Sequence, residues 1–186
     1  MKKLLFLKIP IASLIIAFLI ASNVYSENSV SAKNIYEKSL SDLGIIRSSY
    51  KPEAKVTRAE FITWVVRALS YDQDDASKLN ISCKDVKKGY WAYDNIKIAL
   101  NYSLVEMNPD KTIKPENLIM PKDALTILLK GIGSRTDLTK FSLKDLINES
   151  TAIGLYKDIT LSDNKPLTHA EAYILLYNFL TVDFQS

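Results

Sequence analysis

The sequence has few of the residues that usually carry covalent links and catalysis. Its 186 residues include one cysteine (Cys83), one histidine (His169) and five glycines. A single cysteine excludes an intramolecular disulfide, and no Cys/His cluster has metal-ligand spacing. A nucleophile needs a base within reach, but Cys83 and His169 stand 86 positions apart, and neither a Gly-x-Ser-x-Gly nor a phosphate-binding glycine loop occurs. We therefore expect no enzymatic activity, no metal and no cofactor.

The excess of positive charge is also small and is confined to one end of the chain. There are 24 Lys and Arg against 21 Asp and Glu, a formal net charge of +3. Residues 1–26 contain three lysines and no acidic residue, so residues 27–186 are formally neutral. A protein that binds DNA or RNA needs a local excess of cations to neutralise phosphates. We therefore expect no nucleic-acid partner.

The N-terminus has the pattern of an export signal. Lysines among the first eight residues precede an apolar run from Ile11 to Ala21, and Val24 and Ser26 stand at positions −3 and −1 before Glu27. The apolar run after Pro10 is shorter than the roughly 20 residues that span a bilayer. This pattern predicts a cleaved signal peptide at residues 1–26. The alternative is an uncleaved N-terminal anchor, which would be the only membrane contact.

The rest of the chain repeats one pattern three times: a small residue, a Lys-Pro loop, and an aliphatic residue that opens an apolar helix. The Lys-Pro pairs stand at 51–52, 114–115 and 165–166. The aliphatic residues in register are Val56, Ile119 and Leu167, and the small residues upstream are Gly44, Ser103 and Gly154. Glycine suits a helix C-terminus, where the left-handed conformation is common. Each unit is therefore predicted to be a helix, a loop and a second helix.

Helix signals support this division. Thr57 with Glu60, and Thr168 with Glu171, have the spacing of a capping box. Apolar residues recur at helical spacing after each, at 61, 64, 65 and 69, at 125, 128, 129 and 132, and at 173, 176, 177 and 180. The first helices of the units are predicted at 31–43, 90–103 and 143–153.

One helix-loop-helix unit of this size cannot bury its apolar face alone, whereas three packed together can. The sequence therefore predicts an all-α fold in which three repeats, at about 31–72, 83–133 and 138–182, form one domain over residues 27–186. The expected arrangement is a pseudo-threefold bundle.

Several of these residues carry a resemblance to a known family. Thr57-Arg58-Ala59-Glu60-Phe61 after Tyr50-Lys51-Pro52, followed by Asp85-Val86 and Trp91-Ala92, resembles the S-layer homology repeat. The resemblance implies an exported protein on the surface of a Gram-positive-type envelope. It also implies non-covalent anchoring to the cell wall through grooves between repeats that bind a pyruvylated secondary cell-wall polysaccharide.

The resemblance carries the sugar-facing arginine over to Arg58 alone. Pro121 and His169 stand at the equivalent positions of the other two units, and Lys122 follows one residue later. The candidate glycan-binding residues are therefore Arg58, Glu60, Trp91, Lys122 and His169. Each has a plainer interpretation, as a surface charge, a helix cap, a helix-start aromatic or an ordinary polar residue. The alternative function is a structural or protein-interaction envelope module, with another envelope protein as its partner, that keeps the fold without the glycan.

Overall fold

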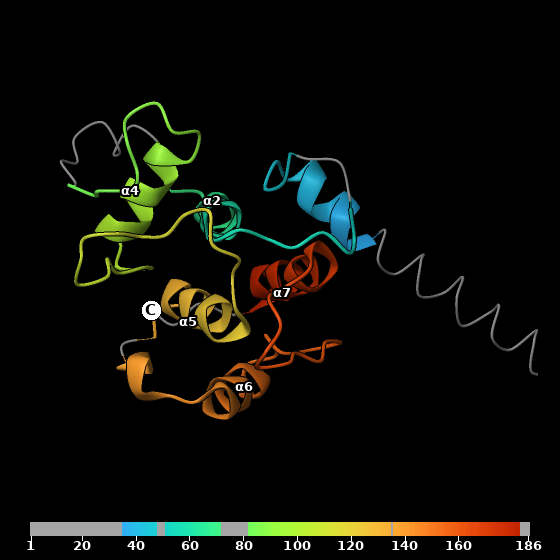
Figure 1. The fold of residues 1–186 in the computed structure, drawn as a ribbon. Coiled ribbons are helices and arrows are strands. Elements are labelled where there is room, and N and C mark those ends of the chain that lie inside the picture. Colours follow the sequence, from blue (N-terminus) through green and yellow to red (C-terminus); the bar gives the residue numbers. More distant parts are fainter. Residues whose placement is uncertain (1–34, 48–50, 72–81, 135, 183–186) are drawn as a thin grey trace, which may run out of the picture. The chain divides into compact units, whose positions relative to one another are not determined.

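The regular structure of the chain is helical, which confirms the all-α prediction (Figure 1). The computed structural model describes residues 35–47, 51–71, 82–134 and 136–182. The helices are α2 (Arg58–Ala68), α4 (Tyr93–Asn101), α5 (Pro121–Gly131), the 3₁₀ turn η1 (Leu138–Lys140), α6 (Leu143–Ala152) and α7 (His169–Thr181). Residues 36–42 are also helical. The predicted signal peptide, residues 1–26, lies outside the described residues.

The helices are short. Within the described ranges, none combines the length and the apolar content needed to cross a membrane. The helix expected over 143–153 is present as α6, whereas the start of the helix expected at 31–43 lies outside the described residues.

The predicted capping boxes are present and confirm the starts of two helices. The Glu60 amide donates to Thr57 Oγ1 (3.2 Å), and the Thr57 amide donates to the Glu60 carboxylate (2.8 Å). Thr168 and Glu171 make the same pair of contacts at the start of α7. Because each box satisfies amide groups that the helix leaves unpaired, the boxes set where α2 and α7 begin.

Two further helix starts differ from this scheme. Ser142 and Asp145 form a capping box on α6 that was not predicted. Helix α5 has Met120 at its N-cap, with no side-chain cap, and Pro121 in its first turn. Its third residue, Asp123, is therefore an acidic side chain without a hydroxyl partner at the cap.

The expected small residues come just after the C-terminal ends of three helices. Gly44, Ser103 and Gly154 have φ values of 70°, 56° and 80°. This left-handed conformation is the one that ends a helix and that glycine adopts most readily.

One helix start was predicted wrongly. The helix expected from Tyr90 begins at Tyr93, because the preceding residues form turns in which the Tyr90 amide donates to Lys87 O (3.0 Å) and the Tyr93 amide to Tyr90 O (2.9 Å). Trp91 consequently lies before the helix and not inside its first turn.

The helices described here belong to one compact unit that begins at Tyr36. Helix α2 contacts α4, α5 and α7, and α5 contacts α6. The helix at residues 36–42 meets α7 through the rings of Tyr36 and Tyr177, whose centroids are 5.0 Å apart. The first helix of each predicted unit therefore packs on the second helix of another unit: α4 on α2, α6 on α5, and residues 36–42 on α7.

A closed ring of backbone hydrogen bonds joins the segments that precede α2, α5 and α7. The Val56 amide donates to Leu167 O (3.0 Å), the Leu167 amide to Ile119 O (3.0 Å), and the Ile119 amide to Val56 O (2.8 Å). All three side chains are buried. These are the three aliphatic residues that the repeat alignment places in register. The ring supports the three-repeat division, which stays a prediction, as does the pseudo-threefold arrangement.

Candidate functional site

Arg58 is held at the start of α2 by a loop of the second predicted unit. Its amide donates to Asn117 O (2.8 Å), and the Ala59 amide donates to Pro115 O (3.0 Å). The first amides of a helix have no partner within the helix, and here the loop supplies the acceptors. The contact brings the Arg58 side chain against residues more than fifty positions away in the sequence.

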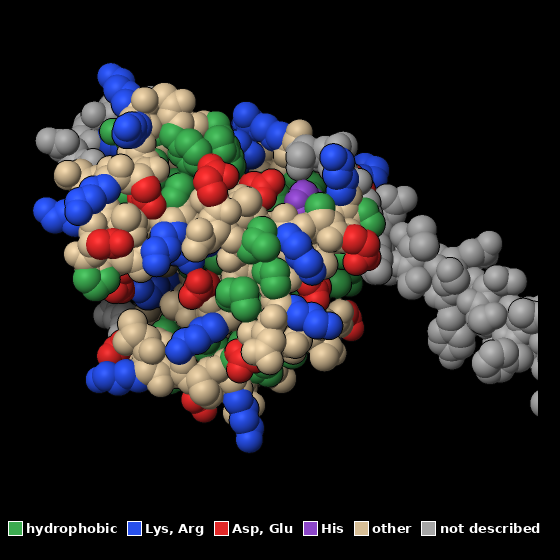
Figure 2. Space-filling view, viewed as in Figure 1, with side chains coloured by type: hydrophobic (Ala, Val, Ile, Leu, Met, Phe, Trp, Pro, Cys, Tyr) green, Lys and Arg blue, Asp and Glu red, His purple; other side chains and the backbone are tan. Residues whose placement is uncertain are grey.

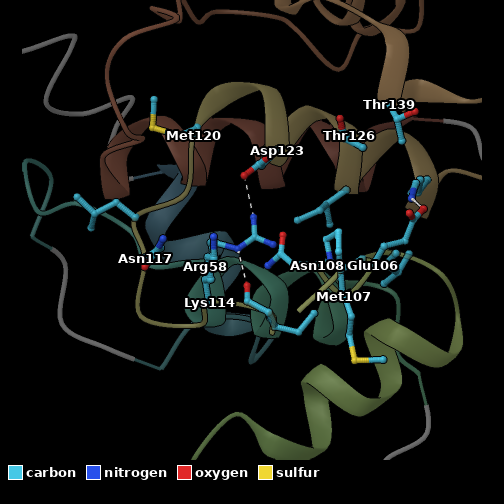
Figure 3. A pocket seen from close by; sticks show the side chains of 17 residues that line it. Arg58, Glu106, Met107, Asn108, Lys114, Asn117, Met120, Asp123, Thr126 and Thr139 are labelled. Atoms are coloured by element: carbon cyan, nitrogen blue, oxygen red, sulfur yellow. Dashed lines mark hydrogen bonds and ion pairs between the residues drawn. The ribbon is translucent and has the colours of Figure 1, made fainter. Parts of the chain in front are cut away.

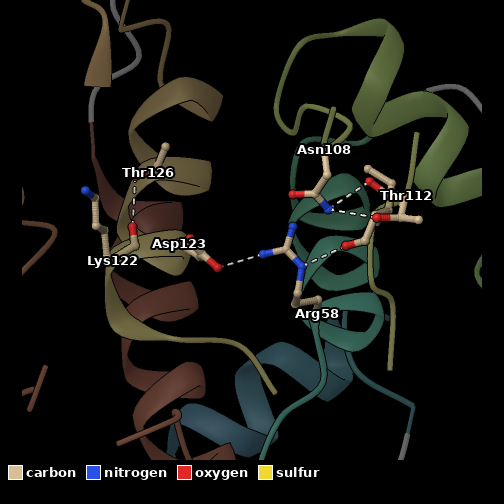
Figure 4. A network of polar contacts seen from close by, with 7 residues as sticks. Arg58, Asn108, Thr112, Lys122, Asp123 and Thr126 are labelled. Carbon is tan, nitrogen blue, oxygen red and sulfur yellow. Dashed lines mark hydrogen bonds and ion pairs between the residues drawn. The ribbon is translucent and has the colours of Figure 1, made fainter. Parts of the chain in front are cut away.

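The Arg58 guanidinium bridges this loop and α5 (Figure 4). Its Nε donates to Ile113 O (3.0 Å), and its Nη1 donates to Asp123 Oδ2 (2.8 Å). The side chain of Arg58 is 16% exposed, and that of Asp123 is 48% exposed. A guanidinium carries five N–H donors, and these two contacts engage two of its nitrogens.

Beside this ion pair lies a pocket of about 530 Å³ (Figure 3). Polar side chains on its lining include Asn108, Lys114, Asn117 and Thr126, and apolar ones include Met107, Leu118 and Met120. A second ion pair, Lys130 Nζ to Glu106 Oε1 (2.7 Å), also belongs to the lining. The charged side chains of the lining are therefore Arg58, Lys114 and Lys130 against Glu106 and Asp123.

The loop that carries Lys114 is fixed by Asp85. The Asp85 carboxylate accepts the amides of Ile113 (3.0 Å) and Lys114 (2.7 Å). Burial acts to raise the pKa of Asp85, but hydrogen bonds from Cys83, Ile113 and Lys114 outweigh it and hold the pKa below its ordinary value. The structure places Asp85 in the loop before α4, where it orders one wall of the pocket.

Of the predicted site residues, Arg58 lines the pocket, and Glu60, Trp91 and Lys122 are not among its lining residues. Glu60 forms the capping box of α2. Trp91 is 57% exposed and lies beside Tyr90, with ring centroids 5.8 Å apart. Lys122 is exposed on α5, and Figure 4 shows its side chain turned away from Arg58. Their roles in glycan binding stay predictions.

His169 occupies the sequence position equivalent to Arg58 but lies in a buried aromatic cluster. It is 6% exposed, its ring centroid is 5.6 Å from that of Trp64, and its Nδ1 is 3.3 Å from Tyr173 Oη. Burial holds the pKa of His169 below its ordinary value, Glu60 acts to raise it, and Lys51 acts to lower it. Burial therefore favours the uncharged form of this side chain, and an anion-binding role for it stays a prediction.

The buried His169 has a measurable consequence for stability. Because its folded-state pKa lies below the unfolded value, protonation favours the unfolded chain. The free energy of unfolding is therefore expected to decrease as the pH falls from about 7 to about 5.5. Chemical denaturation at these two pH values checks this, with His169→Gln as the comparison. The variant is expected to lose less stability on acidification than the wild type, and an equal loss in both would contradict the assignment.

Several polar residues around Arg58 were not predicted as site residues. Asp123, Asn108 and Lys114 come from the loop and helix of the next unit, so their proximity depends on how the units pack. A signal was nevertheless present for Asp123. The alignment matches it to Glu60, while Met120 replaces the capping threonine, which leaves an acidic residue without its usual partner.

The segment that forms the loop wall of the pocket matches a family model. Residues 84–119 match the S-layer homology domain. Over this segment the chain is similar to the S-layer homology family. The match includes Asp85, Lys114 and Asn117, which order or line the pocket, and it confirms the resemblance that the sequence motifs indicated.

Curated relatives of this chain are surface proteins. It is 27% identical over 151 residues to the middle cell wall protein of Brevibacillus brevis and 25% identical over 150 residues to the surface layer protein of Brevibacillus choshinensis, covering 78% of this chain in both comparisons. It is 33% identical over 104 residues, 52% of this chain, to the cellulosome-anchoring protein of Acetivibrio thermocellus. The matched regions span 14%, 13% and 23% of the lengths of these relatives.

Proposed function

We propose that this chain is a cell-surface anchoring module, exported to the wall, that binds a pyruvylated secondary cell-wall polysaccharide in the pocket at Arg58. The domain match and the surface-protein relatives support anchoring at the cell surface. The name of the Acetivibrio relative describes anchoring directly.

The observation that carries the proposal is the Arg58 guanidinium at a polar pocket of sugar size. Pyruvate linked to a sugar as a ketal presents one carboxylate on a neutral ring. A planar guanidinium binds carboxylates by paired, charge-assisted hydrogen bonds. The lining has three cationic side chains against two carboxylates, so it favours an anion, and Asn108, Asn117 and Thr126 add groups suited to sugar hydroxyls.

The apolar part of the pocket is aliphatic. Met107 and Leu118 are 40% and 44% exposed, and the lining formed by the described residues includes no aromatic side chain. A sugar ring in this pocket would pack its C–H groups on these aliphatic side chains. Trp91 does not line the pocket, and we expect it to contact a neighbouring sugar of the same polymer.

The face of the molecule in Figure 2 has no single dominant charge. Basic and acidic side chains are interspersed over that face, with apolar side chains between them. The selectivity for an anionic glycan is assigned to the pocket, because its lining has more cationic side chains than carboxylates.

One observation favours the alternative, a protein-interaction module of the envelope. Arg58 is already paired with Asp123 within the chain, and the exposed apolar side chains of Met107 and Leu118 line the same pocket. The two functions predict different partners on the wall. The first requires the polysaccharide, and the second requires another protein.

Co-sedimentation with purified wall sacculi tests the proposal. The chain without residues 1–26 is expected to pellet with intact sacculi and to stay in the supernatant after the secondary polysaccharide has been extracted. Protease-treated sacculi serve as the control, because they should retain binding if the receptor is a glycan. Pelleting that survives polysaccharide extraction but not protease treatment would contradict glycan anchoring and support the alternative.

A further inference from the structure

We infer that Asp123 is an internal counter-ion that occupies Arg58 in the free protein and must release it when an anionic ligand binds. The inference rests on the proposed function of the pocket. Asp123 then sets the affinity and charge preference of the site, although it lies outside the Thr57–Phe61 motif that contains Arg58.

The contacts of Arg58 limit how a second carboxylate can approach. Nε is engaged by Ile113 O at 3.0 Å, so a side-on pair of hydrogen bonds that uses Nε is blocked. A carboxylate bound through two parallel hydrogen bonds must then use Nη1 and Nη2. Nη1 is the nitrogen that donates to Asp123 Oδ2 at 2.8 Å. The ligand and Asp123 therefore both use Nη1, which carries two N–H groups, and their like charges repel each other at this nitrogen.

The position of Arg58 does not depend on Asp123 alone. The bond to Ile113 O anchors Nε, and the Arg58 amide is held by Asn117 O. Loss of the Asp123 charge should therefore remove the competition for Nη1 from a like charge while the guanidinium stays at the pocket. This distinguishes a competing counter-ion from a residue that positions Arg58.

The local sequence explains why Asp123 is available for this role. In α2, α6 and α7 the acidic residue three positions after the N-cap is bound by a capping Thr or Ser. In α5 the N-cap is Met120, which has no hydroxyl, and the equivalent carboxylate reaches Arg58. The Ser142–Asp145 box of α6 demonstrates that an aspartate can make the capping contact in this fold.

The main test is the affinity of Asp123→Asn for a defined probe. The probe is a methyl hexopyranoside with a pyruvate ketal, and the same glycoside without the ketal is the neutral comparison. Asparagine keeps the shape of the side chain and can accept from Nη1, but it removes the competing charge. Affinity for the ketal probe is expected to rise by about two- to fivefold, the range set by a partly exposed ion pair, with no change for the neutral glycoside.

Asp94→Asn is the matched control. Asp94 also lies in the first turn of a helix, is exposed, and is not among the pocket residues, so this variant makes the same change in net charge elsewhere. A gain in Asp123→Asn that Asp94→Asn does not share supports the inference. Equal effects in both variants, or weaker binding by Asp123→Asn, would overturn it.

A second pair of variants leaves Asp123 in place and covers the case in which Asp123→Asn does not fold. Met120→Ser supplies a hydroxyl that can bind the Asp123 carboxylate as Ser142 binds Asp145, whereas Met120→Ala removes the same thioether without a hydroxyl. Met120→Ser is expected to bind the ketal probe more tightly than Met120→Ala. Equal affinities would contradict the inference.

The outcomes separate this inference from the proposed function. If the wild type binds the ketal probe and Asp123→Asn binds it no better, the inference fails and the proposed function stands. If neither protein binds the ketal probe, the glycan function fails and the inference fails with it.

Discussion

Replacing Arg58 with alanine is expected to weaken binding to the pyruvylated wall polysaccharide by about 10- to 150-fold. This range corresponds to about 1.5–3 kcal/mol, the contribution of a hydrogen bond to a charged group. Arg58 is the cation whose guanidinium stands at the pocket with a fixed Nε contact, so its loss removes the strongest carboxylate-binding group there. Equilibrium binding to the purified polysaccharide measures the effect.

Two comparisons make this result specific. Arg47→Ala removes an exposed arginine that does not line the pocket and is expected to leave affinity unchanged. Arg58→Lys keeps the charge without the planar fork and is expected to lose part of the affinity. A folded Arg58→Ala protein with wild-type affinity would place the ligand elsewhere.

Shortening a buried side chain in the closed ring of backbone hydrogen bonds is expected to have the largest effect on stability. Ile119→Ala should lower the free energy of unfolding by about 2–5 kcal/mol, the range for removing a buried Ile or Leu side chain. Ile119 is fully buried, and its backbone amide donates to Val56 O while its carbonyl accepts from the Leu167 amide. Because these segments are joined in one ring, denaturation should remain a single transition.

Leu118→Ala is the matched control, because Leu118 is the adjacent residue and is 44% exposed. It is expected to change stability by less than about 0.5 kcal/mol, as for most surface substitutions. Denaturation is followed by far-UV circular dichroism for the helices and by fluorescence, to which the buried Trp64 contributes. Separate transitions by the two probes would contradict a single cooperative unit.

The parts of the fold that depend on neighbours in sequence were predictable. Thr57 and Glu60 are three positions apart, and their capping contacts follow from local geometry alone. The left-handed residues Gly44, Ser103 and Gly154 were expected because few other conformations end a helix so readily. Repetition of these signals also gave the register that places Val56, Ile119 and Leu167 in equivalent positions.

The parts that depend on packing were not predictable in the same way. Asp123 is 65 positions from Arg58, so the sequence gives no indication that the two form an ion pair. His169 was predicted as a candidate glycan-binding residue, and packing against Trp64 and Tyr173 buries it. Trp91 was expected just inside a helix and near the groove. The turns before α4 place it ahead of the helix, where it is exposed.

The central claim is that the Arg58 pocket recognises the pyruvate of a wall glycan. Its most direct test is calorimetric titration of the chain with purified wall polysaccharide before and after selective acid removal of the pyruvate ketals, in the wild type and in Arg58→Ala. Removal of the ketals is expected to weaken wild-type binding by about tenfold or more and to abolish the difference between the two proteins. Equal wild-type affinity for the native and depyruvylated polymers would contradict the claim.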